Sequence, residues 1–120
     1  MPKDYPRSDR VADEIQRQLA ETIRHELKDP GVAAFFTISE VEVTRDLSIA
    51  DVHFTVLEAE SVENTLDALQ RARGFLRKRL ASKLRLRNTP QLRFHHDRSV
   101  DDGARMDRLI EAARRRDSHE

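Results

Sequence analysis

The feature that most constrains the fold is an apolar stripe over residues 62–84 that an arginine interrupts. The stripe recurs at helical spacing, at Val62, Leu66, Leu69, Leu76, Leu80 and Leu84. Arg73 lies seven residues after Leu66 and seven before Leu80, so a straight helix would bury its unpaired charge at high cost. Gly74 follows, and glycine weakens a helix interior by about 1 kcal/mol relative to alanine. The pattern predicts a kink here, the alternative being a straight helix whose arginine reaches solvent.

A further helix is predicted near the start of the chain. Within residues 9–28 the apolar side chains recur every four residues, at Val11, Ile15, Leu19, Ile23 and Leu27. Ser8 or Asp9 is a suitable N-cap. The run Asp29-Pro30-Gly31 ends this helix, because proline cannot continue it and glycine accommodates the turn.

Residues 35–57 are predicted to form two strands of an antiparallel hairpin. Apolar and polar side chains alternate regularly over residues 50–56, whereas the alternation over residues 36–43 changes phase. A β-bulge near Ser39 and Glu40 would reconcile the two phases, because a bulge inserts one extra residue into a strand.

A third strand and a short last helix complete the predicted order. Residues 91–96 alternate like a strand, and Ser99 begins a helix with a capping-box-like start. Residues 114–120 have no apolar anchor and are expected to be a disordered tail. We therefore expect one α+β domain over residues 1–113, in the order helix, strand, strand, kinked helix, strand and short helix, with a three-stranded sheet packed by helices.

The charges of the chain balance overall but are segregated along it. The 120 residues include 22 basic and 22 acidic side chains, for a formal net charge of zero. Residues 1–70 carry 7 basic and 15 acidic residues, whereas residues 71–98, the basic block, carry 10 and 1. A neutral sum therefore does not exclude a polyanionic partner, because one side of the fold can be basic.

Composition disfavours several classes of protein. No apolar run approaches the roughly 18 residues of a membrane span, and the first residues lack the apolar stretch of a signal peptide, so we expect a cytoplasmic protein. The absence of cysteine removes disulfides and thiolate metal sites. Glycine-rich phosphate loops, nucleophile elbows and a His-Glu-x-x-His pair are missing, so we expect neither enzymatic activity nor a cofactor.

The run His95-His96-Asp97, with His53 as a further candidate, raises the question of a metal site. Successive residues of a strand point to opposite faces, so His95 and His96 cannot easily share one ion. We expect no metal site.

The basic block is the strongest functional feature of the sequence. Its cations are Arg71, Arg73, Arg77, Lys78, Arg79, Lys83, Arg85, Arg87, Arg93 and Arg98. On a helical wheel Arg71, Lys78 and Arg79 point away from the leucine stripe, while Arg77 and Lys83 flank it. Such a surface can contact phosphates along a groove, and the near-absence of acidic residues favours nucleic acid. The alternative is a solvated face that pairs with the acidic first helix.

The aromatic residues limit the mode of binding. The chain has five phenylalanines, one tyrosine and no tryptophan, and most of the phenylalanines occupy core-facing strand positions. A stacking platform for single-stranded bases is therefore poorly supported. Recognition of folded RNA through its backbone and shape suits these residues better.

An ordered set of motifs covers about residues 7–110. The motifs are Arg7-x-x-Arg10, Lys28-Asp29-Pro30, Val41-Glu42-Val43, Asp46-Leu47-x-x-Ala50-x-Val52, Ala72-x-Gly74-Phe75-Leu76-Arg77, Leu84-Arg85-Leu86-Arg87-x-Thr89-Pro90-x-Leu92-x-Phe94 and the later Asp97. In this order they resemble the ribosome-binding factor A family. No single motif is decisive, but the ordered set is specific.

The resemblance implies a type II KH-like fold, in which Ala72 and Gly74 form a helix kink where KH domains carry a Gly-x-x-Gly loop. Together with the basic block it gives ten candidate RNA-binding residues: Arg7, Arg10, Arg71, Arg73, Arg77, Lys78, Arg79, Lys83, Arg85 and Arg87.

The function implied by the resemblance is that of a monomeric, non-enzymatic bacterial assembly factor. It would bind free 30S subunits and 16S rRNA, including the 5′-terminal helix region. It would assist late 30S maturation, 16S rRNA 5′-end processing and growth in the cold, with ribosome-associated GTPases as further partners. A rival hypothesis is a protein-interaction module that pairs its acidic and basic faces without binding RNA directly.

Overall fold

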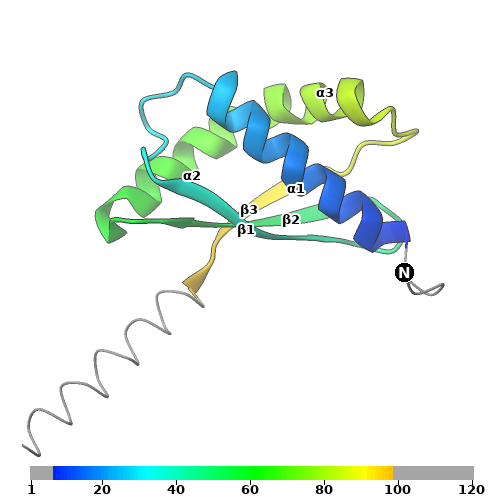
Figure 1. Cartoon of the computed structure of the whole chain (residues 1–120), viewed down its shortest axis with the longest axis horizontal. Helices are drawn as coiled ribbons and strands as arrows, with labels where there is room; N and C mark the ends of the chain where they lie inside the picture. Colours follow the sequence, from blue (N-terminus) through cyan, green and yellow to red (C-terminus); the bar gives the residue numbers. More distant parts are fainter. Residues whose placement is uncertain (1–6, 99–120) are drawn as a thin grey trace, which may run out of the picture.

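The computed structural model describes residues 7–98, and its elements follow the predicted order (Figure 1). They are α1 (Arg7–His25), β1 (Phe36–Val43), β2 (Ile49–Val56), the short 3-10 helix η1 (Ala59–Ser61), α2 (Val62–Arg71), α3 (Arg73–Leu84) and β3 (Gln91–His96). The predicted order of helix, strand, strand, kinked helix and strand is confirmed. The predicted last helix and the tail over residues 114–120 lie outside the described residues.

The three strands form one sheet in the order β1-β2-β3. β1 and β2 pair as the predicted antiparallel hairpin, and their register shifts between Ile38 and Glu40. This irregularity confirms the predicted β-bulge. β3 pairs parallel to β2, with Ala50 opposite Leu92 and Val52 opposite Phe94. The crossover between these parallel strands is the broken helix α2–α3.

The predicted kink is present and has the predicted cause. Ala72 separates α2 from α3, with φ −86° and ψ 0°. The break leaves Arg73 exposed, while Leu69 before it and Leu76 after it are completely buried. A straight helix with a snorkelling arginine is therefore not what the chain adopts.

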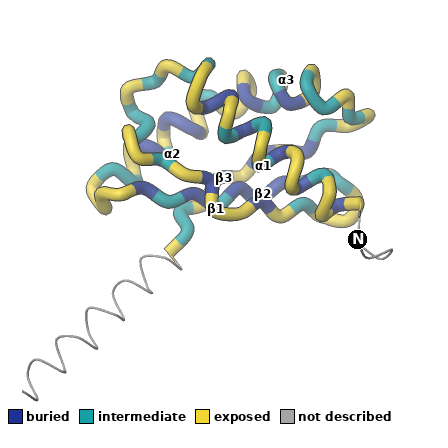
Figure 2. The backbone as a smooth tube through the Cα atoms, in the orientation of Figure 1, coloured by how far each residue is buried: buried dark blue, intermediate teal, exposed yellow. Residues whose placement is uncertain are grey.

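The three α-helices lie on one face of the sheet, and the core fills the space between them (Figures 1 and 2). Ile15 and Leu19 of α1, Val52 and Phe54 of β2 and Leu80 of α3 are among its fully buried side chains. The opposite face of the sheet carries polar side chains and is not covered by a helix in the part of the chain that the structure describes.

The loop between α1 and β1 is fastened to α2. Asp29 accepts a hydrogen bond from the Gly31 amide at 2.8 Å, and Thr65 of α2 accepts one from the Ala33 amide at 3.1 Å. A Cβ atom at Gly31 would lie 3.1 Å from the Ala68 Cβ and 3.2 Å from the Asn64 carbonyl oxygen. The helix that precedes this loop ends at His25, slightly earlier than the predicted limit of residue 28.

None of the helices within residues 7–98 has the length and apolar character that a membrane span requires.

Candidate nucleic-acid interface

Several cations of the basic block are occupied by contacts inside the protein. Arg77 is half-buried, and its guanidinium donates hydrogen bonds to the Thr89 carbonyl at 2.7 and 3.2 Å and to the Pro90 carbonyl at 3.2 Å. Pro90 is itself fully buried just before β3. Arg77 therefore fastens α3 to the segment that leads into β3.

Arg79 and Lys83, one turn apart on α3, both contact Glu26 next to the end of α1. Arg79 Nη2 lies 2.6 Å from one oxygen of the Glu26 carboxylate, and Lys83 Nζ lies 2.8 Å from the other. Lys83 also donates to the hydroxyl of buried Thr22 at 2.9 Å. The hydrogen bond from Lys83 lowers the pKa of Glu26, and the positive charges of Arg79 and Lys83 add to this effect.

Arg71 is the fourth cation with an internal partner. Its guanidinium donates to both oxygens of Asp29, at 3.2 and 3.3 Å, while its side chain stays 62% exposed. The hydrogen bond from the Gly31 amide is the main cause that lowers the pKa of Asp29, and the Arg71 guanidinium contributes. We call these four residues the anchored cations: Arg71, Arg77, Arg79 and Lys83.

Four other cations of the block, on α3 and in the loop that leads to β3, are exposed and have no ion pair within the described residues. We call them the open cations: Arg73, Lys78, Arg85 and Arg87. Arg73 stands at the start of α3, directly after the kink. Arg85 follows the last turn of α3 in the left-handed region, with φ 51° and ψ 38°.

An open hollow of about 450 Å³ lies between α3 and the loop that leads to β3. Gly74, Lys78 and Arg87 line it, together with Arg77, Ala81, Asn88 and Thr89. A Cβ atom at Gly74 would meet no atom within 4 Å, so the glycine leaves the backbone of the kink accessible from solvent. Two open cations beside accessible backbone amount to a surface to which a phosphate chain can come close.

Arg7 and Arg10, also predicted to bind RNA, lie at the other end of α1. Both are exposed and neither forms an ion pair with another residue of the range 7–98. The rise of an α-helix separates Arg10 from Glu26 by about 24 Å along α1. The structure therefore does not bring these two arginines to the point where α1 contacts α3.

The phenylalanines divide into two groups. Phe54 and Phe94 are buried in the sheet, and Phe36 packs against Phe54 with ring centroids 5.6 Å apart. Phe35 and Phe75 are instead 70% and 43% exposed. The predicted core positions thus account for the strand phenylalanines, but Phe75 of α3 is an accessible aromatic ring within the basic block that the sequence argument did not consider.

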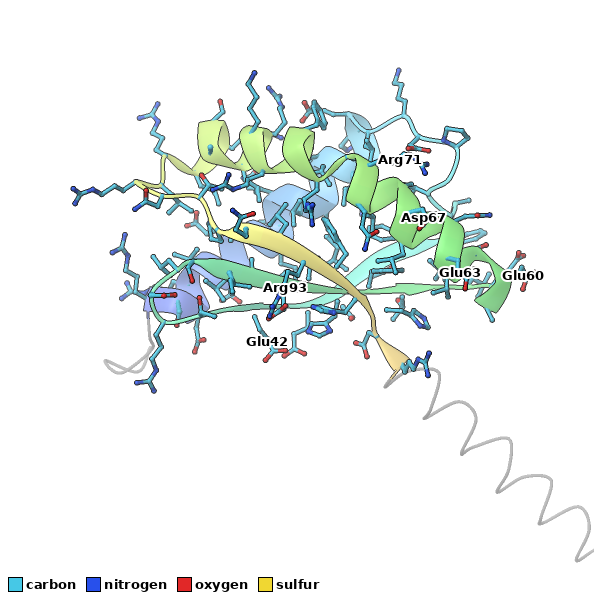
Figure 3. The ribbon with its side chains drawn as sticks, turned by 180° about the vertical axis from the view of Figure 1, so that it is seen from behind. Glu42, Glu60, Glu63, Asp67, Arg71 and Arg93 are labelled. Atoms are coloured by element: carbon cyan, nitrogen blue, oxygen red, sulfur yellow. The ribbon has the colours of Figure 1, made fainter. Side chains whose placement is uncertain are left out.

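The uncovered face of the sheet carries a network of polar side chains in which Arg93 is paired with a carboxylate. Asp51 contacts Arg93 at 2.8 Å and His95 at 2.7 Å, and the hydrogen bond from Arg93 is the main cause that lowers its pKa. The ring of His95 stacks on that of His53 at 5.2 Å. Figure 3 shows Arg93 and Glu42 on this face, away from the helices.

One cluster on this face contains residues of metal-ligating type. Glu40, Glu42 and His53 each offer one ligand atom, and these atoms lie within 4.8 Å of one another. His53 already lies 3.0 Å from Glu42 Oε1, and both carboxylates are exposed. His53 was a candidate ligand in the sequence but the two glutamates were not, because the bulge is what brings them beside it. His96 points to the other face, where its ring lies 5.7 Å from that of Phe54.

A second hollow, of about 390 Å³, lies between α1 and β1, away from the basic block. Its lining combines apolar side chains, including Ile23, Phe36 and Ile38, with polar ones, including Arg17 and Arg24 of α1. None of the open cations lines this second hollow.

The fold and the basic surface define a small α+β domain with a kinked, cation-bearing helix pair. Residues 7–110 match the family model described as ribosome-binding factor A. A ribosome-binding factor A from Azoarcus sp. is 50% identical over 118 residues, which cover 98% of this chain and 93% of that protein. The chain belongs to the ribosome-binding factor A family.

Solved structures of related proteins agree with this assignment. The solution structure of a Thermotoga maritima ribosome binding factor A is 37% identical, with a TM-score of 0.71 over 82% of this chain and 93% of that one. A further match is to the coordinates of a homology model of Thermus thermophilus ribosome binding factor A, as fitted into the cryo-EM map of a 30S complex with this factor, whose sequence is 33% identical. For these the TM-score is 0.62, and the match covers 72% of this chain and 91% of that one.

Proposed function

We propose that this protein is a non-enzymatic assembly factor that binds free 30S subunits through 16S rRNA. Membership of the ribosome-binding factor A family supports the ribosome as its target. The Thermus thermophilus relative, which forms a complex with the 30S subunit, supports the small subunit in particular. We extend the proposal to late 30S maturation and 5′-end processing of 16S rRNA in the cytoplasm, including in the cold, with the 5′-terminal helix region and ribosome-associated GTPases as partners.

The observation that carries the RNA part of the proposal is the group of open cations beside Gly74. Arg73, Lys78, Arg85 and Arg87 are exposed on α3 and on the residues that follow it. The Gly74 position has room for a close neighbour. An RNA backbone needs this combination, because its phosphates require unpaired positive charge and its chain requires steric access.

The anchored cations support the same surface in a different way. Arg77 fixes the loop that carries Arg87, since it donates to Thr89 and Pro90. Arg79 and Lys83 fix α3 against α1 through Glu26. A surface held in one shape loses less conformational freedom when it binds.

The test is a triple charge reversal of the open cations, Arg73→Glu, Lys78→Glu and Arg87→Glu, in the full chain. Binding to purified free 30S subunits is measured by co-sedimentation at moderate salt. We expect the affinity to fall by roughly 100-fold or more, because three phosphate contacts become repulsive. Arg77 and Arg79 are unsuitable for reversal, because both have partners inside the protein.

The matched control reverses three exposed arginines outside the proposed surface, Arg17→Glu, Arg24→Glu and Arg45→Glu. Arg17 and Arg24 line the hollow between α1 and β1, and Arg45 lies in the turn between β1 and β2. This variant should bind 30S subunits like the unaltered chain. Equal loss in both variants would show that only the total charge matters, and full binding by the triple variant would show that the proposed surface is wrong.

An acidic stripe on α2 favours one rival, the protein-interaction module. Glu60, Glu63 and Asp67 are exposed on one side of α2 and its preceding turn, with no partner within residues 7–98 (Figure 3). If this stripe pairs with the open cations of a second copy, sedimentation will show a dimer that salt dissociates. Ribonuclease treatment would then not change the set of proteins that a pull-down with this chain recovers.

A further inference from the structure

An exposed aromatic ring lies within the basic block, and it has no packing role that explains its position. Phe75 is 43% exposed, whereas Leu76 beside it in α3 and Leu80 one turn later are buried. Successive residues of a helix are turned by about 100°, so the ring projects away from the side of α3 that faces the core. Within the described residues, Phe35 and Leu57 are the other large apolar side chains with such exposure, and neither belongs to the basic block.

Cations stand one turn away on both sides of this ring. Lys78 and Arg79, three and four residues later in α3, share its side of the helix, because residues at these spacings are neighbours. Arg71 precedes it by four residues, and the helical spacing is maintained across the break, since the Leu76 amide donates to the Ala72 carbonyl at 2.9 Å. An aromatic face flanked by cations is thus displayed directly after the kink.

Two of these neighbours are held in position by carboxylates. Arg71 is bound by Asp29, and Arg79 is bound by Glu26, yet their side chains remain 62% and 41% exposed. Each guanidinium therefore keeps surface that a phosphate can reach while its orientation is fixed. Lys78 is exposed and adds a third positive charge beside the ring.

We propose that Phe75 is a stacking site for an unpaired nucleotide of the bound RNA. A base stacks on the ring while the flanking phosphates contact Lys78 and the fixed guanidinium groups. Paired bases in a duplex are already stacked and expose only their edges, so the site selects a single-stranded or extruded nucleotide. This inference rests on the proposed RNA-binding function and adds to it the form of RNA that the kink recognises.

The test uses a fluorescent reporter that the sequence makes possible. The chain contains no tryptophan, so Phe75→Trp and the control Phe35→Trp each introduce a single tryptophan, which is excited selectively at wavelengths where Tyr5 does not absorb. The probes are a single-stranded RNA oligonucleotide of mixed sequence and an RNA duplex of the same length. We expect the single strand to quench the fluorescence of the Phe75→Trp variant strongly, the duplex to quench it weakly, and neither to affect the Phe35→Trp variant.

Affinity measurements provide an independent readout. Phe75→Leu should weaken binding of the single strand by roughly tenfold, because base–aromatic stacking is lost, and should leave duplex binding within twofold. Phe75→Tyr keeps the ring and should bind like the unaltered chain, and Phe35→Leu is the matched control. Circular dichroism checks that each variant is folded, and the fluorescence of the Phe75→Trp variant tests the site even if Phe75→Leu does not fold.

The outcomes separate this inference from the proposed function. If the chain binds the single strand and 30S subunits but the Phe75→Trp variant is not quenched, the stacking site is refuted while RNA binding stands. Equal loss of single-strand and duplex binding in Phe75→Leu would also refute it. If the unaltered chain binds neither RNA nor 30S subunits, the proposed function itself fails.

Discussion

Two groups of cations in one stretch of 17 residues, Arg71 to Arg87, have opposite surroundings. The anchored cations Arg71, Arg77, Arg79 and Lys83 each reach a carbonyl or carboxylate oxygen elsewhere in the fold. The open cations Arg73, Lys78, Arg85 and Arg87 reach no such oxygen within residues 7–98. The same side-chain chemistry thus joins parts of the fold at four positions and leaves positive charge exposed to solvent at four others.

This difference changes how the basic block is interpreted. One of the two hypotheses, pairing with the acidic first helix, is met at Arg79 and Lys83, which contact Glu26 next to the end of α1. Binding of nucleic acid by the open cations stays a prediction. Arg77 and Lys83 are half-buried and can therefore bind phosphates only after losing an internal contact. The open cations, and the exposed parts of Arg71 and Arg79, can bind phosphates without such a loss. Variants can separate the two groups, because a loss of stability and a loss of affinity are measured independently.

The largest expected effect is on stability, when an anchored cation and an open cation are each replaced by alanine and their free energies of unfolding are compared. Arg77→Ala removes three hydrogen bonds to the Thr89 and Pro90 carbonyls. Hydrogen bonds from charged groups contribute about 1.5–3 kcal/mol, so we expect the free energy of unfolding in urea to fall by about 2–3 kcal/mol.

Lys78→Ala is the matched control for Arg77→Ala, because Lys78 lies next to Arg77 on α3 but is exposed. Its effect on the free energy of unfolding should stay within about 0.5 kcal/mol, as is usual for surface substitutions. Equal urea midpoints for the two variants would remove the distinction between anchored and open cations.

The salt dependence of binding counts how many cations contact phosphates. Each phosphate contact contributes about −0.7 to the slope of log affinity against log salt for single-stranded nucleic acid. The four open cations, together with Arg71 and Arg79 beside the proposed stacking site, therefore predict a slope of about −4, a loss of roughly 300-fold between ~50 and ~200 mM salt. A slope near −6, measured with purified 30S subunits, would mean that the half-buried cations Arg77 and Lys83 also contact phosphates.

Most of the backbone could be predicted because its causes are local. Arg73 in the leucine stripe indicated the kink, and the phase change around Ser39 indicated the bulge. Alternation over residues 91–96 matched β3 at both ends. In each case the decisive contacts follow from residues close together in the sequence, so periodicity alone was sufficient.

The division between anchored and open cations could not be predicted in the same way. Glu26 and Lys83 are 57 residues apart, so their contact depends on how α1 crosses α3. The helical wheel placed Arg77 and Lys83 beside the apolar stripe, and both are half-buried. The same wheel placed Arg79 on the side away from the core, yet its guanidinium contacts Glu26. A long, flexible side chain can reach a partner that the position of its Cα atom does not indicate.

A pH titration tests the anchored pair at Glu26. Its pKa is lowered below the ordinary value of 4.5, mainly by the hydrogen bond from Lys83. A carboxyl whose pKa is depressed in the folded state stabilises the fold above its unfolded pKa and loses that effect as pH falls through its folded pKa. The difference in the free energy of unfolding between the unaltered chain and Glu26→Gln should be constant near pH 7 and shrink below about pH 4.5.

This difference measurement isolates Glu26 from the other titrating carboxyls. The pKa values of Asp29, Asp46 and Asp51 are also lowered, but these groups titrate in both proteins and largely cancel. The matched control is Glu21→Gln, because Glu21 is exposed on the same helix. A difference that does not depend on pH would show that the hydrogen bonds to Glu26 do not stabilise the fold through its charge.

The smallest expected effect concerns Arg85, where the requirements of fold and binding conflict. Arg85 ends α3 with φ 51°, a left-handed conformation that costs a residue with a Cβ about 1 kcal/mol and suits glycine. Its amide closes the last turn on the Ala81 carbonyl, a bond that glycine can also make. Arg85→Gly should therefore raise the free energy of unfolding by up to about 1 kcal/mol and, by removing an open cation, lower the affinity for 30S subunits a few-fold. Arg85→Lys is the control, because it keeps the charge and should change neither the free energy of unfolding nor the affinity appreciably. If Arg85→Gly gains stability without losing affinity for 30S subunits, Arg85 does not belong to the RNA-binding surface, and three open cations remain.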